Sequence, residues 1–182
     1  MVQGRRDILK LIGGAASTIV AGVPGRLLAA ERPAEARRLR FDNLHTGETL
    51  DAVYWEKGTY VPDALEAINV VLRDFRTGDV HPIAPKLLDL LVTLRGTVGT
   101  GKPFEVISGY RSPRTNAMLA SESAGVAHSS LHMQGMAIDI RLADVALSHL
   151  HDAALKLASG GVGYYPQSDF VHVDVGRVRR WG

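Results

Sequence analysis

The sequence predicts an α+β fold with a mostly antiparallel sheet and flanking helices. Segments with helical spacing alternate with short segments of strand-like alternation, and no regular β–α–β repeat runs along the chain. The chain has 182 residues, of which 46% are apolar, and this is enough for one domain with a well-buried core. We therefore expect one folded domain at residues 37–182, behind an N-terminal targeting segment at residues 1–36.

The first part of the domain predicts a hairpin followed by two helices. Residues 38–55 alternate as two short strands around the turn-forming residues 45–48. A helix is expected to begin after Pro62 and to end near Gly78, because apolar residues between them recur at helical spacing. A second helix is expected at residues 84–94, where four leucines give it an apolar side.

The second part predicts four more strands and two more helices. The expected strands cover residues 104–107, 136–142, 160–165 and 170–175, and the expected helices cover residues 113–122 and 143–158. In the strand at 136–142, Ile138 and Ile140 point to an apolar layer while Asp139 points the other way. The last strand divides in the same manner, with Val171 and Val173 on the apolar side.

Composition excludes several kinds of site. The chain has no cysteine, so a disulfide framework, a thiol nucleophile and thiolate metal ligands are all excluded. Five of the 21 basic and three of the 19 acidic residues lie in residues 1–36, so residues 37–182 hold 16 of each and are formally neutral. The charge pattern thus favours no nucleic-acid partner. Any metal must be bound by histidine and carboxylate.

The N-terminal segment has the order of an export signal. A basic region with Arg5 and Arg6 precedes an uncharged stretch at 11–25, and small residues follow as cleavage sites after Ala30 or Ala36. The arginine pair resembles a twin-arginine signal, which implies the twin-arginine export machinery and a periplasmic destination. The alternative is an amphipathic helix of the domain. The stretch is too short and glycine-rich for a stable membrane span.

Two histidines and an aspartate form the candidate metal site. Asp139 lies on the polar face of its strand, His132 lies in the loop just before it, and His172 lies on the polar face of the last strand. If the two strands are neighbours, the three side chains can meet. Such a triad with an open fourth position is typical of catalytic zinc, which lowers the pKa of bound water to about 7. The alternative is that each histidine is an ordinary surface residue.

Several motifs together resemble a known enzyme family. The pattern S-x-H-x-x-G-x-A-x-D at 130–139, the strand histidine and the preceding S-G-Y-R resemble the zinc peptidases of the D-alanyl-D-alanine peptidase and hedgehog-like fold. Residues 38–182 as a whole resemble the twin-arginine-exported murein endopeptidases. The further resembling segments are 43–48, 73–76, 108–112, 160–166 and 170–174.

The resemblance implies a ligand set and a substrate. It implies a hedgehog-like or D-Ala-D-Ala peptidase-like fold that binds Zn²⁺ through His132, Asp139 and His172. The implied substrate is the peptide stems of peptidoglycan, cut between meso-diaminopimelate residues as in 3→3 cross-links. Arg111, at the end of S-G-Y-R, is expected to face the metal cleft and to bind a substrate carboxylate or the tetrahedral oxyanion. The alternative is an exposed arginine.

Two acids compete for the role of general base. The resemblance implies both: many members of the fold place an acid three residues before the last zinc histidine, and Asp169 meets this D-x-x-H spacing, whereas the exported endopeptidases have an H-x-D pattern that Asp174 meets. Asp174 follows two residues after that histidine, on the same face of the strand, where it could activate water or orient the ligand. Spacing favours Asp169 as the base, with Asp174 as the alternative.

Rival functions follow from the same residues. One is a D,D-carboxypeptidase or D,D-endopeptidase of the same fold, and the other is a non-catalytic, zinc-stabilised cell-wall-binding domain. A fourth protein ligand, such as His128, would favour the non-catalytic domain, because structural zinc sites are closed. Tyr164 and Tyr165 could line the cleft or pack in the interior.

Overall fold

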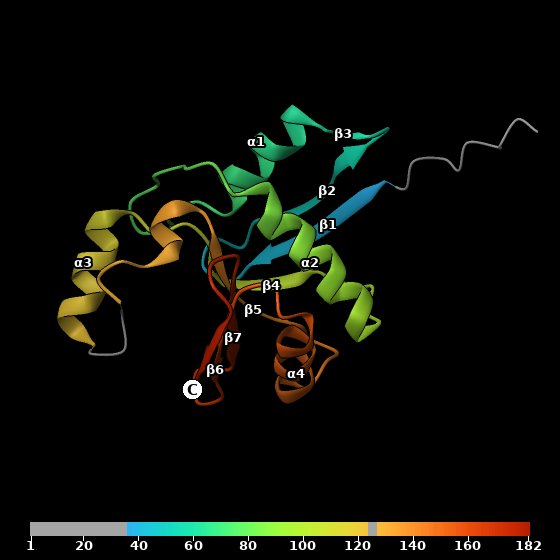
Figure 1. Cartoon of the computed structure of the whole chain (residues 1–182). Helices are drawn as coiled ribbons and strands as arrows, with labels where there is room; N and C mark the ends of the chain where they lie inside the picture. The colour runs from blue at the N-terminus through green and yellow to red at the C-terminus, as the bar shows by residue number, and fades with distance from the viewer. Residues whose placement is uncertain (1–35, 124–126) are drawn as a thin grey trace, which may run out of the picture. The chain divides into compact units, whose positions relative to one another are not determined.

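The computed structural model describes residues 36–123 and 127–182 (Figure 1). Residues 1–35, which hold nearly all of the predicted export segment, lie outside the described residues. Within the described ranges, none of the helices has both the length and the apolar character that a membrane crossing needs.

A single eight-stranded mixed sheet organises the described residues. Its strands in spatial order are β3 (Thr59–Tyr60), β2 (Thr49–Glu56), β1 (Arg37–Asn43), β4 (Phe104–Ser108), β5 (Ala137–Arg141), β7 (Phe170–Asp174), β6 (Gly161–Tyr165) and β8 (Arg179–Trp181). All pairings are antiparallel except β1 with β4 and β6 with β8. The prediction of an α+β fold with a mostly antiparallel sheet is therefore confirmed.

Four α-helices accompany the sheet in the described ranges. They are α1 (Pro62–Val71), α2 (Pro85–Val98), α3 (Pro113–Glu122) and α4 (Leu147–Leu157). The first three begin with proline, whose fixed φ suits the first helical position and whose missing N–H is not needed there. Ser112 also caps α3 by accepting a hydrogen bond from the Thr115 N–H.

The end of α1 differs from the prediction. The helix ends at Val71, well before Gly78. Beyond it the Asp74 N–H bonds to the Asp79 carbonyl, and the Asp74 carboxylate accepts the N–H groups of Arg76 and Ser112. Because these bonds give the backbone an alternative to helix continuation, the apolar spacing alone misplaced the boundary.

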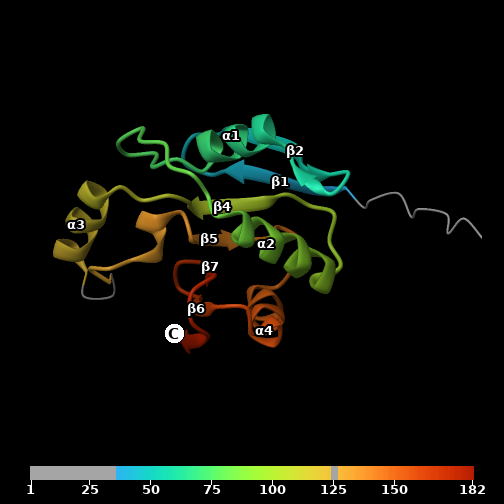
Figure 2. The ribbon, with the colours of Figure 1, turned by 45° about the horizontal axis from the view of Figure 1, so that its top comes forward.

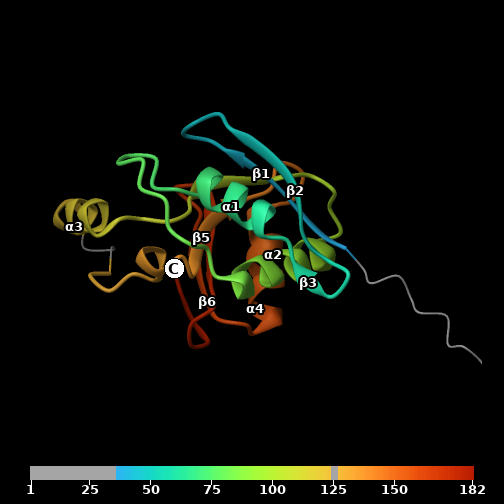
Figure 3. The ribbon, with the colours of Figure 1, turned by 90° about the horizontal axis from the view of Figure 1, so that it is seen from above.

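One apolar core lies between the sheet and three helices. Figure 2 shows α2 and α4 on the same side of the sheet, and α1 packs on β2. The largest fully buried side chains include Tyr54, Phe41 and Phe104, and the core extends to Ile138 and Ile140 as predicted. Helix α3 instead projects beyond the sheet, as seen from above in Figure 3. The face of β5 and β7 opposite the core is thus left for the polar residues.

Strands β3 and β8 were not predicted. Each has two or three residues, too few to give a readable alternation. Strand β8 adds to the edge of the sheet by parallel pairing with β6. It places Arg179–Trp181 at the edge of the sheet, one strand beyond β6.

Candidate metal centre

The pairing of β5 with β7 brings two of the predicted ligands together. Asp139 lies directly opposite His172 in this antiparallel register, so both side chains point to the same face. Their neighbours Ile138 and Val173 form the next pair and enter the core on the other face. The two strands are thus neighbours, which is the condition under which the sequence allowed these side chains to meet.

His132 reaches the same point from a short 3₁₀ helix, Leu131–Gln134. Ser130 caps this turn by accepting the His132 N–H at 3.3 Å. Gly135 ends it with φ +64°, and an added Cβ there would lie 2.2 Å from the Pro82 carbonyl oxygen, so glycine is required. The turn thus holds the imidazole over β5.

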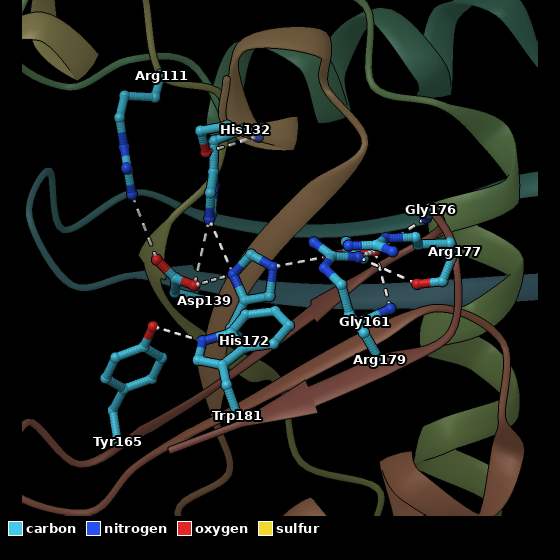
Figure 4. A network of polar contacts seen from close by, with 12 residues as sticks. Arg111, His132, Asp139, Gly161, Tyr165, His172, Gly176, Arg177, Arg179 and Trp181 are labelled. Atoms are coloured by element: carbon cyan, nitrogen blue, oxygen red, sulfur yellow. Dashed lines mark hydrogen bonds and ion pairs between the residues drawn. The ribbon is translucent and has the colours of Figure 1, made fainter. Parts of the chain in front are cut away.

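Three potential ligand atoms converge (Figure 4). His132 Nε2 lies 3.2 Å from His172 Nδ1 and 3.3 Å from Asp139 Oδ1, and His172 Nδ1 lies 2.8 Å from Asp139 Oδ1. All three residues are buried. In the described ranges, these residues form a group that could hold a metal ion.

The outer contacts of both histidines show which ring nitrogen carries the proton when each imidazole is neutral. His132 Nδ1 lies 2.7 Å from the Gly109 carbonyl oxygen, which can only accept, so Nδ1 carries the proton. His172 Nε2 likewise donates to Asp174 Oδ2 at 3.1 Å. When His172 is neutral, two imidazole lone pairs and a carboxylate face one another at about 3 Å, and a cation between them satisfies all three. This donor set, with no cysteine, fits Zn²⁺.

The electrostatics of the site agree with a cation-binding role. Burial alone raises the pKa of Asp139, but the two imidazoles outweigh it and hold that pKa below its usual range. Burial alone lowers the pKa of His172, but the contacts with Asp139 and Asp174 outweigh it and raise this pKa to about 9. A metal ion that binds here therefore displaces a proton.

Arg111 lines the cavity beside Asp139. Its Nη2 lies 3.6 Å from Asp139 Oδ2, and its Nη1 makes one long hydrogen bond of 3.4 Å to Asn116. The buried Nε has no hydrogen-bond partner among residues 36–123 and 127–182. Burial lowers the pKa of this guanidinium, although arginine remains charged. Arg111 thus has N–H donors to spare next to the ligand atoms.

A cavity of about 490 Å³ has His132, Asp139 and His172 in its wall. The wall also includes Arg111, Ser130, Tyr165, Phe170, Arg179 and Trp181. The wall combines cationic and hydroxyl groups with aromatic rings. Its size and mixed polarity suit a peptide with charged groups better than a purely apolar ligand.

The two acids near His172 lie in very different places. Asp174 is fully buried and accepts hydrogen bonds from the N–H groups of Gly161 and Gly176 and from His172 and Arg179. Asp169 is exposed in the turn between β6 and β7, with its Oδ2 2.6 Å from Arg141 Nη1. The structure brings Asp174 to the outer nitrogen of His172 but does not bring Asp169 to the ligand atoms.

Of the remaining residues that the sequence singled out, one lines the cavity and two do not. His128 is exposed and is not among the described donors that could hold a metal. Tyr165 lines the cavity, whereas Tyr164 stacks on His151. Sequence reasoning missed Arg179 and Trp181, which line the cavity from β8.

Comparisons with known proteins find similarity over nearly the whole chain. The Peptidase_M15_2 family model, described as peptidoglycan L,D-endopeptidase MepK, matches residues 31–181. The peptidoglycan L,D-endopeptidase MepK of Escherichia coli (strain K12) is 42% identical over 178 residues, which is 97% of this chain and 96% of the relative. The probable peptidoglycan L,D-endopeptidase MepK of Haemophilus influenzae is 41% identical over 180 residues, covering 98% and 96%.

Proposed function

We propose that this protein uses one zinc ion to cut 3→3 cross-links in the periplasm. The proposal starts from its family: the chain belongs to the Peptidase_M15_2 family of peptidoglycan L,D-endopeptidases and so is a metallopeptidase acting on peptidoglycan. The bond in question joins two meso-diaminopimelate residues. The observation that carries the zinc proposal is the convergence of two imidazole lone pairs and the Asp139 carboxylate within about 3 Å of each other. The relatives' L,D-endopeptidase names support the choice of bond.

His132, Asp139 and His172 would hold the metal on the floor of the cavity. When bound, zinc supplies Lewis-acid chemistry, polarising a carbonyl and lowering the pKa of a water. Asp174 keeps the proton of His172 on Nε2, so that Nδ1 remains a ligand. Arg111, with its unused donors, binds either a substrate carboxylate or the oxyanion that forms as the amide is attacked.

Asp169 remains our candidate for the general base. In the described conformation its carboxylate pairs with Arg141, so it must exchange this partner to reach the substrate. Its neighbours Ser168 and Phe170 line the cavity, which places the turn at the cavity rim. Substrate-free enzymes often hold catalytic groups in long or misaligned contacts, so this geometry does not remove the candidate.

Residues 1–36 are proposed as a twin-arginine signal and residues 37–182 as the peptidase domain. The position of β1, which begins at Arg37, supports this boundary. Replacing Arg5 and Arg6 with lysine should leave unprocessed precursor in the cytoplasm, because the pair identifies the route. Normal processing and periplasmic yield of this variant would contradict the twin-arginine route.

The D,D-specific and non-catalytic alternatives can be tested together with the main proposal. The zinc-loaded protein is incubated with purified 3→3 and 4→3 cross-linked muropeptide dimers, and the products are identified by mass. We expect the 3→3 dimer to be cut and the 4→3 dimer to stay intact, with His172→Ala as the inactive control. Cleavage of the 4→3 dimer alone would indicate a D,D-endopeptidase. Stoichiometric zinc without cleavage of either dimer would favour a binding domain.

A further inference from the structure

Strand β8 lies two strands' width from the metal ligands, with β6 next to it and β7 beyond. The pairing registers place four residues in one row across the sheet: Asp139 on β5, His172 on β7, Gly163 on β6 and Trp181 on β8. Residues in one row point to the same face. Because Gly163 has no side chain, Trp181 and His172 have nothing between them.

The indole of Trp181 fills this gap. A Cβ added to Gly163 would lie 2.6 Å from Trp181 Cε2 and Nε1, so the ring packs directly on the glycine. The indole centroid lies 5.1 Å from that of the His172 ring, and its Nε1 donates to the Tyr165 hydroxyl at 2.8 Å (Figure 4). Trp181 therefore contacts His172 on the side away from Asp139 and is itself held in place.

A second glycine on β6, Gly161, lets the Arg179 side chain reach Asp174. Arg179 pairs with Gly161 in the register of β6 and β8, and a Cβ on Gly161 would lie 2.4 Å from both Arg179 Nη1 and Asp174 Oδ2. Across this glycine, Arg179 Nη2 donates to Asp174 Oδ2 at 2.7 Å and Nη1 to Oδ1 at 3.1 Å. Such a two-pronged contact fixes the plane of the carboxylate.

We propose that β8 is part of the metal centre and that Arg179 and Trp181 are positioning residues for His172. Arg179 orients the Asp174 carboxylate, which accepts the Nε2 proton of His172 and leaves Nδ1 facing Asp139 and His132. Trp181 restricts rotation of the same imidazole. This inference rests on the proposed zinc site, and it explains why β6 carries glycine at both positions that β8 side chains must cross.

The contacts predict an effect on metal affinity rather than on folding alone. Without Arg179, Asp174 retains the N–H groups of Gly161 and Gly176, both on Oδ1. The other oxygen, Oδ2, is the one that His172 contacts, and it would lose its arginine donor. The carboxylate would then stay buried and hydrogen-bonded through Oδ1, while Oδ2 would hold the His172 ring less firmly in its orientation. Changes to such outer partners typically cost about 10–100-fold in metal affinity.

The test compares Arg179→Gln with Arg180→Gln in the full-length protein. Arg180 is the next residue on β8, is exposed and points to the opposite face, so its substitution makes the same charge change without touching Asp174. Zinc affinity of the folded protein is measured by chelator competition, and thermal unfolding is measured on the zinc-free form. We expect Arg179→Gln to bind zinc about 10–100-fold more weakly and Arg180→Gln to match the wild type.

Two further variants separate positioning from bulk stability. Arg179→Lys keeps the charge but cannot make the two-pronged contact, so its zinc affinity should lie between those of the wild type and Arg179→Gln. Trp181→Leu should also weaken zinc binding, by less than Arg179→Gln, and it tests the inference separately if Arg179→Gln fails to fold.

Equal zinc affinity in the wild type, Arg179→Gln and Trp181→Leu would overturn the inference while leaving the zinc site intact. The inference is also overturned if the variants only lower the unfolding temperature of the zinc-free protein. Absence of zinc binding by the wild type would instead overturn the proposed metal centre, and this inference with it.

Discussion

The two faces of strands β5 and β7 differ completely, although they are built from alternate residues of the same short segments. On one face Ile138, Ile140, Val171 and Val173 lie in the apolar core under α2 and α4. On the other face Asp139, His172 and Asp174 point at each other across 3 Å contacts. Burial of apolar surface is the dominant stabilising term in folding, so the core face carries the stability and the polar face is free to carry chemistry.

One substitution on each face of these strands tests this division of roles, and we expect the largest effects from these two. His172→Ala should lose most of the bound zinc and all measurable hydrolysis while still folding, because its face does not supply the core. Ile138→Ala on the opposite face should destabilise the protein by about 2–5 kcal/mol through loss of buried surface and cavity formation, yet its folded fraction should bind zinc. Metal analysis and denaturant unfolding measure the two quantities. Undiminished zinc in His172→Ala would show that the ligand set is wrong.

Arg111 tests the wall of the cavity. Arg111→Gln removes a guanidinium whose Nε has no partner in the described residues, and we expect kcat/KM on 3→3 dimers to fall by about 10²–10³-fold. A fall carried by kcat would assign Arg111 to the oxyanion, while a rise in KM with unchanged kcat would assign it to a substrate carboxylate. Activity within a few-fold of wild type would mean that Arg111 contacts neither.

Substitutions of Asp169 and Asp174, the acids on either side of His172, should have effects as large as that of Arg111→Gln or smaller. Asp169→Asn should keep its zinc and lose at least about a hundredfold in turnover if Asp169 is the base. Asp174→Asn should weaken zinc binding by about 10–100-fold and recover activity partly in excess zinc.

Arg141→Gln is the control for Asp169, because it removes the ion pair with Asp169, together with the Arg141–Glu105 pair, and keeps the acid. Surface pairs of this kind contribute at most about 1 kcal/mol each, so Arg141→Gln should have a small effect on activity. Equal losses in Arg141→Gln and Asp169→Asn would reduce Asp169 to an ion-pair partner. A zinc-loaded but inert Asp174→Asn beside an active Asp169→Asn would transfer the base to Asp174.

Strict alternation placed Asp139 and His172 on the polar faces of their strands, whereas contacts between distant segments did not show in the sequence. Ile138 and Ile140 identified the buried face of β5 and so placed Asp139 on the other face, while its position opposite His172 depends on the pairing of β5 with β7. The pairing of Asp169 with Arg141 depends on a turn in which Asp169 adopts φ +53°, which spacing does not reveal. The approach of Arg179 to Asp174 depends on a three-residue strand, and only the glycines at 161 and 163 hint at it in the sequence.

Asp74 is a polar residue that contributes to the stability of the fold, as the apolar face of β5 and β7 does. We expect its substitution to have the smallest effect. It is buried in the loop after α1, where burial alone would raise its pKa. Hydrogen bonds from Thr115 and from the N–H groups of Ser112 and Arg76 outweigh burial and lower the pKa to about 2, from an ordinary value of 3.8. The unfolded chain therefore binds this proton more readily, so the contribution is present above about pH 4 and is lost as the pH falls toward 2.

The shift corresponds to about 2 kcal/mol of unfolding free energy. Urea unfolding of the zinc-free protein between pH 2 and pH 6 should show this loss in the wild type, and Asp74→Asn should be less stable at pH 6 but vary less with pH in that window. Asp63→Asn is the matched control, because Asp63 is exposed in the first turn of α1 and its replacement should leave the wild-type slope. If Asp74→Asn follows the wild-type curve in parallel, the acid sensitivity comes from the polar face of β5 and β7 instead. Both faces of these strands would then contribute to the stability of the fold.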